Sequence, residues 1–83
     1  MFPTTPLATW DRDTVRAVAL AYRRQRQAGE SDLPARIAAE EAYLDLHPTV
    51  PEREASDTVA RMIASVASEH GAWFWQGVGE PRR

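Results

Sequence analysis

The two histidines, His47 and His70, are the first candidates for catalysis, because imidazole exchanges protons near neutral pH. They lie on different predicted elements, and neither belongs to a spacing that binds zinc or calcium. His47 precedes Pro48 at a predicted helix end, where histidine interacts favourably with the negative end of the helix dipole. His70 lies within an apolar stripe, which favours a core or boundary position over a catalytic base. We therefore expect no metal site at either histidine.

Other residue types give no better basis for catalysis. The adjacent Glu40 and Glu41 diverge by about 100° on a helix, so they do not form a carboxylate pair. The serines of residues 56–68 lack the glycines of a nucleophile elbow, and Gly77 and Gly79 precede no helix that could receive a phosphate. The absence of cysteine excludes disulfides, zinc fingers and thiol catalysis. We expect a protein that is not an enzyme and that uses no cofactor.

A stripe of arginines is the first candidate for binding. Residues 1–29 hold five arginines and two acidic residues, a balance of +3, whereas residues 30–70 hold nine acidic residues and three arginines, a balance of −6. Four arginines share one helix face at their spacing and are candidate contacts to an anion or a partner: Arg12, Arg16, Arg23 and Arg26. Two interpretations stay open, namely phosphate contacts in a nucleic-acid-binding regulator and ion pairs with the acidic helices of the same chain. Because the net charge is −2 and the second helix is acidic, we expect no tight nucleic-acid binding.

The aromatic run Trp73-Phe74-Trp75 is the second candidate for binding. Consecutive residues of a helix point in different directions, so the three rings cannot all face one core. Tryptophan and arginine are typical of the residues that dominate binding energy at protein interfaces. Either Trp73 and Phe74 fill the core and Trp75 is half buried, or at least one tryptophan forms a protein-binding surface. We expect such a surface to contain Trp73, Trp75, Tyr43 and Leu46.

Two of the helices that position these residues have clear local signals. The first is predicted over about 13–28, with Asp11 or Asp13 as N-cap and Gly29 just beyond its end. Its apolar face consists of Val15, Val18, Ala19 and Tyr22. The second is predicted over 32–46, with Ser31 or Asp32 as N-cap, Pro34 in its first turn and Pro48 just after its end. Its apolar residues form two faces, Leu33, Ile37 and Leu44 on one, and Ala35, Ala39, Tyr43 and Leu46 on the other. Such a helix lies between the other two or leaves one face for a partner.

The third helix is predicted over about 50–76, beginning at the capping-box pattern of Thr49–Glu52. Eight residues share one face if this helix runs through Gly71: Ala55, Val59, Met62, Ile63, Val66, His70, Trp73 and Phe74. Because all eight lie on one face, a helix that continues through Gly71 is favoured, although a glycine costs about 1 kcal/mol in a helix interior. In the alternative, the helix ends at Gly71 and the aromatic segment folds back on the bundle.

These segments predict an all-α fold in one domain over residues 1–83, a compact three-helix bundle without a sheet. An extended arm is expected over 1–10 and a flexible tail over 77–83. Residues 1–6 lack the basic and apolar regions of a signal peptide, and no apolar run is long enough to span a membrane, so we expect a cytoplasmic protein.

The sequence indicates a function in binding rather than in catalysis. One small core does not cover the apolar side chains of both faces of the second helix and of the aromatic run, so we expect a homodimer paired about a two-fold axis. The favoured interpretation is a small non-enzymatic protein that binds another protein, as a regulator, an adaptor or an inhibitor of the kind that mobile elements encode. A nucleic-acid-binding regulator that uses the arginine stripe and a structural homo-oligomer are the alternatives.

Overall fold

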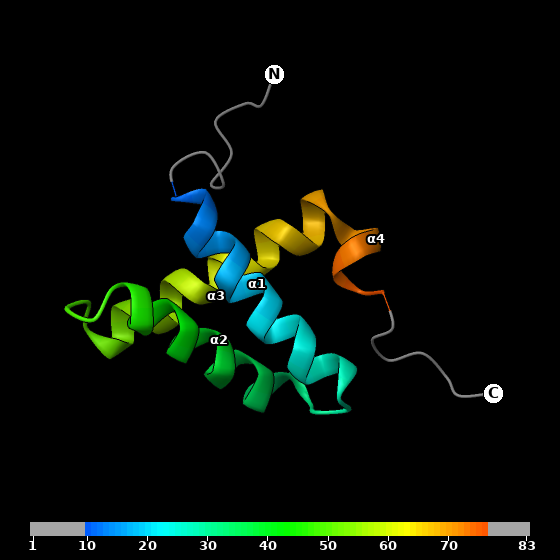
Figure 1. Cartoon of the computed structure of the whole chain (residues 1–83), viewed down its shortest axis with the longest axis horizontal. Helices are drawn as coiled ribbons and strands as arrows, with labels where there is room; N and C mark the ends of the chain where they lie inside the picture. The colour runs from blue at the N-terminus through cyan, green and yellow to red at the C-terminus, as the bar shows by residue number, and fades with distance from the viewer. Residues whose placement is uncertain (1–9, 77–83) are drawn as a thin grey trace, which may run out of the picture.

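A computed structural model describes residues 10–76, and within them three long helices pack against one another. These are α1 (Arg12–Gln27), α2 (Asp32–Leu46) and α3 (Glu52–Glu69), and a short helix α4 (Gly71–Phe74) follows (Figure 1). The described residues contain no strand. The predicted three-helix bundle is therefore confirmed. Apart from Trp10, the predicted arm (1–10) and the predicted tail (77–83) lie outside the described residues.

Both ends of α1 follow from local side-chain and backbone chemistry. Asp11 is the N-cap, and its carboxylate accepts a hydrogen bond from the backbone N–H of Thr14 at 3.1 Å. At the other end, Gly29 adopts a left-handed conformation with a φ of 98°. The N–H of Gly29 donates to the carbonyl of Arg26, and the N–H of Glu30 donates to that of Gln25, both at 3.0 Å. This pair of bonds is a Schellman motif, so the prediction of Gly29 as the residue that ends the helix is confirmed.

The two described helix-end glycines give a matched pair of stability predictions. Gly29→Ala is expected to lower the free energy of unfolding by about 1–2 kcal/mol, because a Cβ disfavours the left-handed conformation. Gly71 has no positive φ, and a Cβ added there meets no atom within 4 Å. Gly71→Ala should therefore leave stability unchanged or raise it by about 0.4–1 kcal/mol. Urea denaturation of both variants checks this, and equal losses would contradict the assignment of the turn at Gly29.

The second and third helices begin without side-chain caps. Ser31 is the N-cap of α2 but makes no capping hydrogen bond, and α2 ends at Leu46 with His47 as the C-cap, as Pro48 predicted. The predicted capping box at Thr49 is wrong, because Pro51 is the N-cap of α3 and no side chain caps that end. Two carboxylates in the first turn, Glu52 and Glu54, instead interact favourably with the positive end of the α3 dipole.

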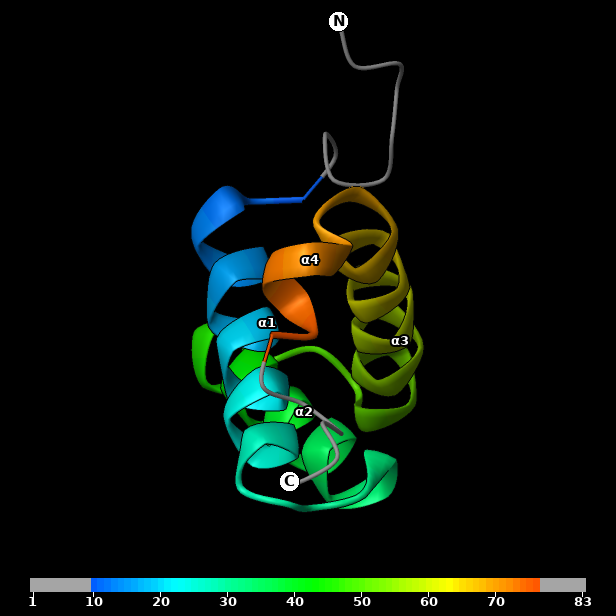
Figure 2. The same cartoon turned by 90° about the vertical axis from the view of Figure 1, so that its right-hand side faces the viewer.

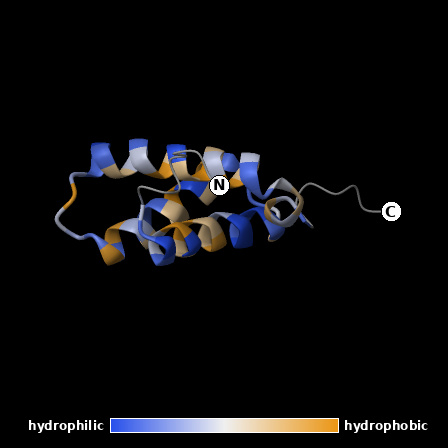
Figure 3. Ribbon diagram, turned by 90° about the horizontal axis from the view of Figure 1, so that it is seen from above, coloured by the Kyte–Doolittle hydropathy of each residue, from blue (hydrophilic) through white to orange (hydrophobic). Residues whose placement is uncertain are grey.

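The core lies where the three long helices meet, and the apolar parts of the ribbons gather on their facing sides (Figure 3). Each helix supplies residues at helical spacing: Val18, Ala19 and Tyr22 from α1; Ala35, Ala39 and Tyr43 from α2; Ala55, Val59, Met62 and Val66 from α3; and Phe74 from α4. The predicted apolar face of α1 is confirmed, with Val15 packed at its edge. Four alanines in this core allow the helix backbones to approach one another closely.

The prediction of one helix over 50–76 is wrong, because the chain turns between α3 and α4. His70 leaves the helical region, with φ −133° and ψ 44°, so α3 ends at Glu69. The turn brings Phe74 against Tyr22 of α1, where its side chain is fully buried. Burying a phenylalanine stabilises by about 1.5–3 kcal/mol. A continuous helix would instead place a glycine in its interior at a cost of about 1 kcal/mol. The alternative, an aromatic segment that folds back on the bundle, is confirmed, although Gly71 begins α4 and His70 is the C-cap of α3.

Candidate functional site

The aromatic cap, Trp73, Phe74 and Trp75, is built around the burial of its central ring. Phe74 stacks on Tyr22 with ring centroids 5.4 Å apart and an interplanar angle of 6°. Trp75 meets both of these rings edge to face, at 4.8 Å from Phe74 and 6.2 Å from Tyr22. Figure 2 shows α4 lying between α1 and α3, which places the cap over one end of the bundle. Offset and edge-to-face rings of this kind attract one another beyond the area that they bury.

The two tryptophans flank the buried ring and remain partly open to solvent. Trp73 and Trp75 each expose 40% of their surface. The expectation that Trp73 lies with Val66 on the buried face of the third helix is therefore wrong, because the turn at His70 rotates Trp73 outward. One consequence is that Phe74 alone fills the core at this end, while a pair of indoles lies on the surface.

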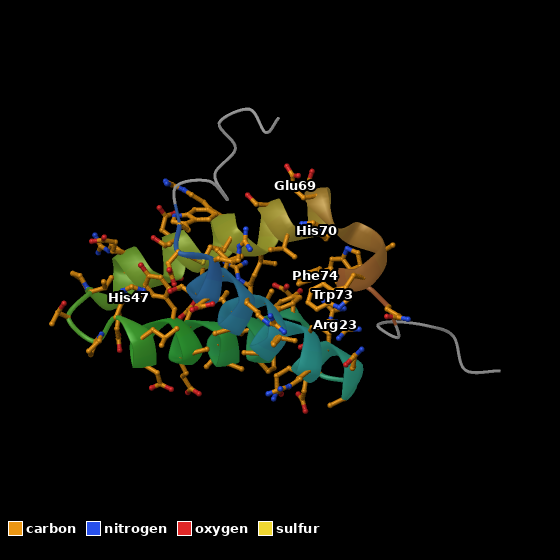
Figure 4. All side chains as sticks on the ribbon, turned by 45° about the horizontal axis from the view of Figure 1, so that its top comes forward. Arg23, His47, Glu69, His70, Trp73 and Phe74 are labelled. Carbon is orange, nitrogen blue, oxygen red and sulfur yellow. The ribbon has the colours of Figure 1, made fainter. Side chains whose placement is uncertain are left out.

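Polar side chains of α1 hold the cap in place. The guanidinium of Arg23 lies 4.5 Å from the centre of the Trp73 ring and donates from Nε to the Trp73 carbonyl at 3.1 Å (Figure 4). Arg26 lies 5.8 Å from the Trp75 ring and donates to the Tyr22 hydroxyl at 3.0 Å. Gln27 donates to the carbonyl of Gln76 at 2.9 Å. Cation–π contacts and hydrogen bonds to carbonyls near the end of α4 thus fix the orientation of both indoles.

The Tyr22 hydroxyl links this end of α1 to the start of α2. It donates to the carboxylate of Asp32 at 2.6 Å, and Asp32 also lies 3.7 Å from Arg36. Burial raises the pKa of the Tyr22 hydroxyl above its ordinary value of 10.0, and the hydrogen bond to Asp32 raises this pKa further. Arg26 acts in the opposite direction, because its positive charge favours the phenolate, but the pKa of Tyr22 remains raised.

The raised pKa of Tyr22 predicts a loss of stability in alkaline solution. The folded state favours the neutral hydroxyl, so its stabilisation is complete below the unfolded pKa of 10.0 and is lost as the pH rises through the folded pKa. Tyr22→Phe cannot ionise and should lose less free energy of unfolding between about pH 8 and pH 11. Urea denaturation across this range checks the prediction. An identical pH dependence in the two proteins would show that Tyr22 does not contribute.

A groove of about 250 Å³ adjoins Trp75, and we call it the Trp75 groove. Its lining is mostly apolar on the α3 side and polar on the α2 side: Tyr22, Asp32, Arg36, Ala60, Ile63, Ala64, Ala67 and Trp75. A wider hollow of about 740 Å³ lies further along α2 and α3 and is lined mainly by polar and charged side chains: Arg36, Pro51, Arg53, Glu54, Ser56, Asp57 and Ala60. Of the two, only the Trp75 groove is lined by an exposed tryptophan.

The structure separates the four arginines of the predicted stripe. Arg23 and Arg26 lie on the aromatic rings, whereas Arg12 and Arg16 are exposed toward the start of α1. Within the described residues, ion pairs join only residues of the same helix, Asp32 with Arg36 and Asp57 with Arg61. The interpretation that the acidic helices neutralise the stripe by ion pairs therefore finds no support in residues 10–76.

His47 lies at the end of α2 as predicted, but its contact there was not predicted, and neither was the place of His70. The imidazole Nε2 of His47 lies 3.1 Å from the hydroxyl of buried Thr14, which in turn donates to Asp11 at 3.1 Å. This contact joins the start of α1 to the end of α2, and Thr14 was missed because no local pattern relates it to His47. His70 was expected at the core or its boundary but is exposed at the turn between α3 and α4. Across residues 10–76, no three acidic or histidine side chains cluster as metal ligands would.

The remaining predicted binding residues lie on α2. Tyr43 is buried in the core with its ring 4.9 Å from that of His47, whereas Leu46 exposes 50% of its surface. Leu33 and Ile37, on the second apolar face of α2, expose 68% and 48%. Leu46 and this second face belong to α2, whereas Trp73 and Trp75 both belong to the aromatic cap, one on each side of Phe74.

Comparison of the chain with protein-family models, with curated proteins and with solved structures finds no match. Among the described residues, no helix has the length and apolar character needed to cross a membrane. The function is therefore inferred from the arrangement of the side chains.

Proposed function

We propose that this protein acts in the cytoplasm as a small non-enzymatic regulator, adaptor or inhibitor that binds another protein through its aromatic cap. One observation carries the proposal: Trp73 and Trp75 are each 40% exposed yet fixed in orientation by Arg23 and Arg26. Tryptophan and arginine are enriched among the residues that dominate binding energy. Side chains that are already ordered before binding lose little conformational entropy when a partner covers them.

The rest of the described surface supports the same conclusion. Five large apolar side chains are exposed in a bundle of this size: Leu33, Ile37, Leu46, Trp73 and Trp75. Single exposed apolar residues are common on soluble proteins, but adjacent ones that border an apolar groove are typical of interaction sites. Trp75 meets that description, because it lines the Trp75 groove together with Ile63 and Ala67.

Affinity capture from the cells that produce the protein tests this proposal. Tagged wild-type protein, Trp75→Ser and Ile37→Ser are compared, and the captured proteins are quantified by mass spectrometry. Ile37→Ser is the matched control, since Ile37 is exposed to a similar extent (48%) but lies on α2 outside the cap. We expect a protein that is captured by the wild type and by Ile37→Ser and is lost with Trp75→Ser. Recovery of the same proteins in equal amounts with all three baits would contradict the proposal.

A nucleic-acid-binding regulator is a second candidate, favoured by the absence of ion pairs to the α1 arginines within residues 10–76. Two of these arginines are already engaged by aromatic rings, and α2 carries Glu40, Glu41 and Asp45. We therefore expect no micromolar or tighter complex with random duplex DNA at about 150 mM salt. A fluorescence anisotropy titration measures this. A tight complex that weakens steeply as salt rises would instead favour the second candidate.

A further inference from the structure

The end of the bundle that carries the aromatic cap is basic. Residues 23–36 hold four arginines and two acidic residues, and residues 71–76 add no charge. One of the acidic residues, Asp32, is already engaged by Tyr22 and Arg36. Glu69 belongs to the neighbouring α3 terminus, but its carboxylate points away from Trp73 and Arg23 (Figure 4). We call this region, with the Trp75 groove in it, the basic end.

The opposite end, where α2 leads into α3, is acidic and carries an exposed leucine. Residues 40–57 hold six acidic residues and one arginine, and we call this region the acidic end. Leu46 is 50% exposed there, next to Asp45. A carboxylate in the last turn of a helix lies near the negative end of the dipole, and the last turn of α2 contains no basic residue to offset it. A basic partner surface would relieve this unfavourable charge.

We propose that the Trp75 groove receives Leu46 of a second copy of this chain, so that the acidic end of one copy meets the basic end of the next. The two surfaces are opposite in charge, and both are apolar at the point of contact. Leucine is apolar, as is the α3 wall of the groove formed by Ile63, Ala64 and Ala67. The groove volume of about 250 Å³ is sufficient, because an enclosed cavity of roughly 150 Å³ holds a benzene molecule.

The arrangement of the two surfaces determines the symmetry of this contact. A two-fold pairing through the groove would bring two basic ends together, and like charges would repel. The contact between a groove and a leucine at the other end is instead heterologous, so it repeats from copy to copy and forms open chains or a ring. This inference rests on the proposed function in one respect, because Trp75 belongs both to the cap and to the groove.

Sedimentation velocity of the wild type over a range of concentrations gives the first test. We expect the weight-average mass to rise beyond that of a dimer with concentration. The mass should fall toward that of the monomer in about 1 M salt, where charges are screened beyond roughly 3 Å. A wild type that stays monomeric up to millimolar concentration would overturn the inference. Such a result would leave the capture experiment and the proposed function unaffected, whereas failure of the capture experiment would leave self-association intact.

Two variants that each disable one end give the second test. Ala64→Glu places bulk and negative charge in the groove, and Leu46→Lys removes the apolar side chain and reverses the local charge; both positions are exposed. Each variant alone should be monomeric, because it lacks one of the two surfaces. An equimolar mixture should form a 1:1 dimer that grows no further, since one intact groove meets one intact leucine. Ile37→Ser should associate as the wild type does.

Two outcomes of the mixing experiment would overturn the inference. One is a mixture that stays monomeric while the wild type associates. The other is a wild type whose mass saturates at a dimer that neither variant disrupts, which would indicate a two-fold interface elsewhere. Circular dichroism establishes that both variants keep the helical content of the wild type, so a loss of folding is not mistaken for a loss of association.

Discussion

Truncating Phe74 to alanine is expected to lower the free energy of unfolding by about 3–5 kcal/mol. Phe74 is fully buried, stacks on Tyr22 and supports the edge of Trp75, so its removal leaves a cavity between α1 and α4. A chain of 83 residues has a total stability of only about 4–12 kcal/mol. The variant should therefore be partly or largely unfolded in dilute urea, as measured by circular dichroism.

Trp73→Ala is the control for Phe74→Ala, because it removes a neighbouring aromatic ring that is partly exposed. Trp73 is the larger side chain, but 40% of its surface is already exposed, and it contacts Arg23 at the surface. Its truncation should cost clearly less than that of Phe74, because less apolar area returns to water and no enclosed cavity forms. An equal or greater loss with Trp73→Ala would mean that the third helix runs on as the sequence predicted, with Trp73 in the core.

Alanine in place of either Trp73 or Trp75 is expected to weaken the captured partner's affinity by about 30-fold or more, equivalent to about 2 kcal/mol. Both indoles are exposed and held in place, so a partner can cover them at little entropic cost. Isothermal titration calorimetry with the purified partner measures the affinity of each variant.

Leu33→Ala is the control for this comparison. Leu33 exposes 68% of its surface, more than either tryptophan, but lies on α2 and is not held by cation–π contacts. It should change the affinity by less than about threefold, within the range of residues at the margin of an interface. A larger loss of affinity for Leu33→Ala than for the tryptophan variants would indicate that the partner binds the second apolar face of α2 instead.

The limits of α1 and α2 could be predicted because their signals are local. Asp11 bonds to a backbone N–H three residues away, and Gly29 ends α1 through bonds to Gln25 and Arg26. Pro48 ends α2 by excluding the residue before it from the helical region. Each of these interactions lies within a few residues, so the sequence pattern contains both partners.

The sequence indicated the turn after α3 only as the less favoured alternative, because the contacts that stabilise the turn are distant in the sequence. Eight residues on one face favoured a continuous helix, and Gly71 was the one local signal of an end. The turn is stabilised by the packing of Phe74 on Tyr22 and by the bonds from Arg23 to the end of α4, contacts that span about fifty residues. The link between Thr14 and His47 was missed for the same reason.

The arginine stripe shows why a shared helix face does not imply a shared function. All four arginines of the stripe lie on one side of α1, yet only the C-terminal part of that side meets α4. Arg23 and Arg26 therefore orient tryptophans, whereas Arg12 and Arg16 remain exposed. Helical spacing predicts which side chains align, but the tertiary fold decides which of them find partners.

An NMR titration of the isotopically labelled protein with its captured partner tests the central claim most directly. The chain has three tryptophans, so its spectrum contains three indole N–H signals, from Trp10, Trp73 and Trp75. If the aromatic cap is the binding surface, the signals of Trp73 and Trp75 will shift or broaden as the partner is added. The signal of Trp10, which packs against the core beside the start of α1, will stay in place. A shift of Trp10 alone, or no change in the signals of Trp73 and Trp75 at saturation, would contradict the account.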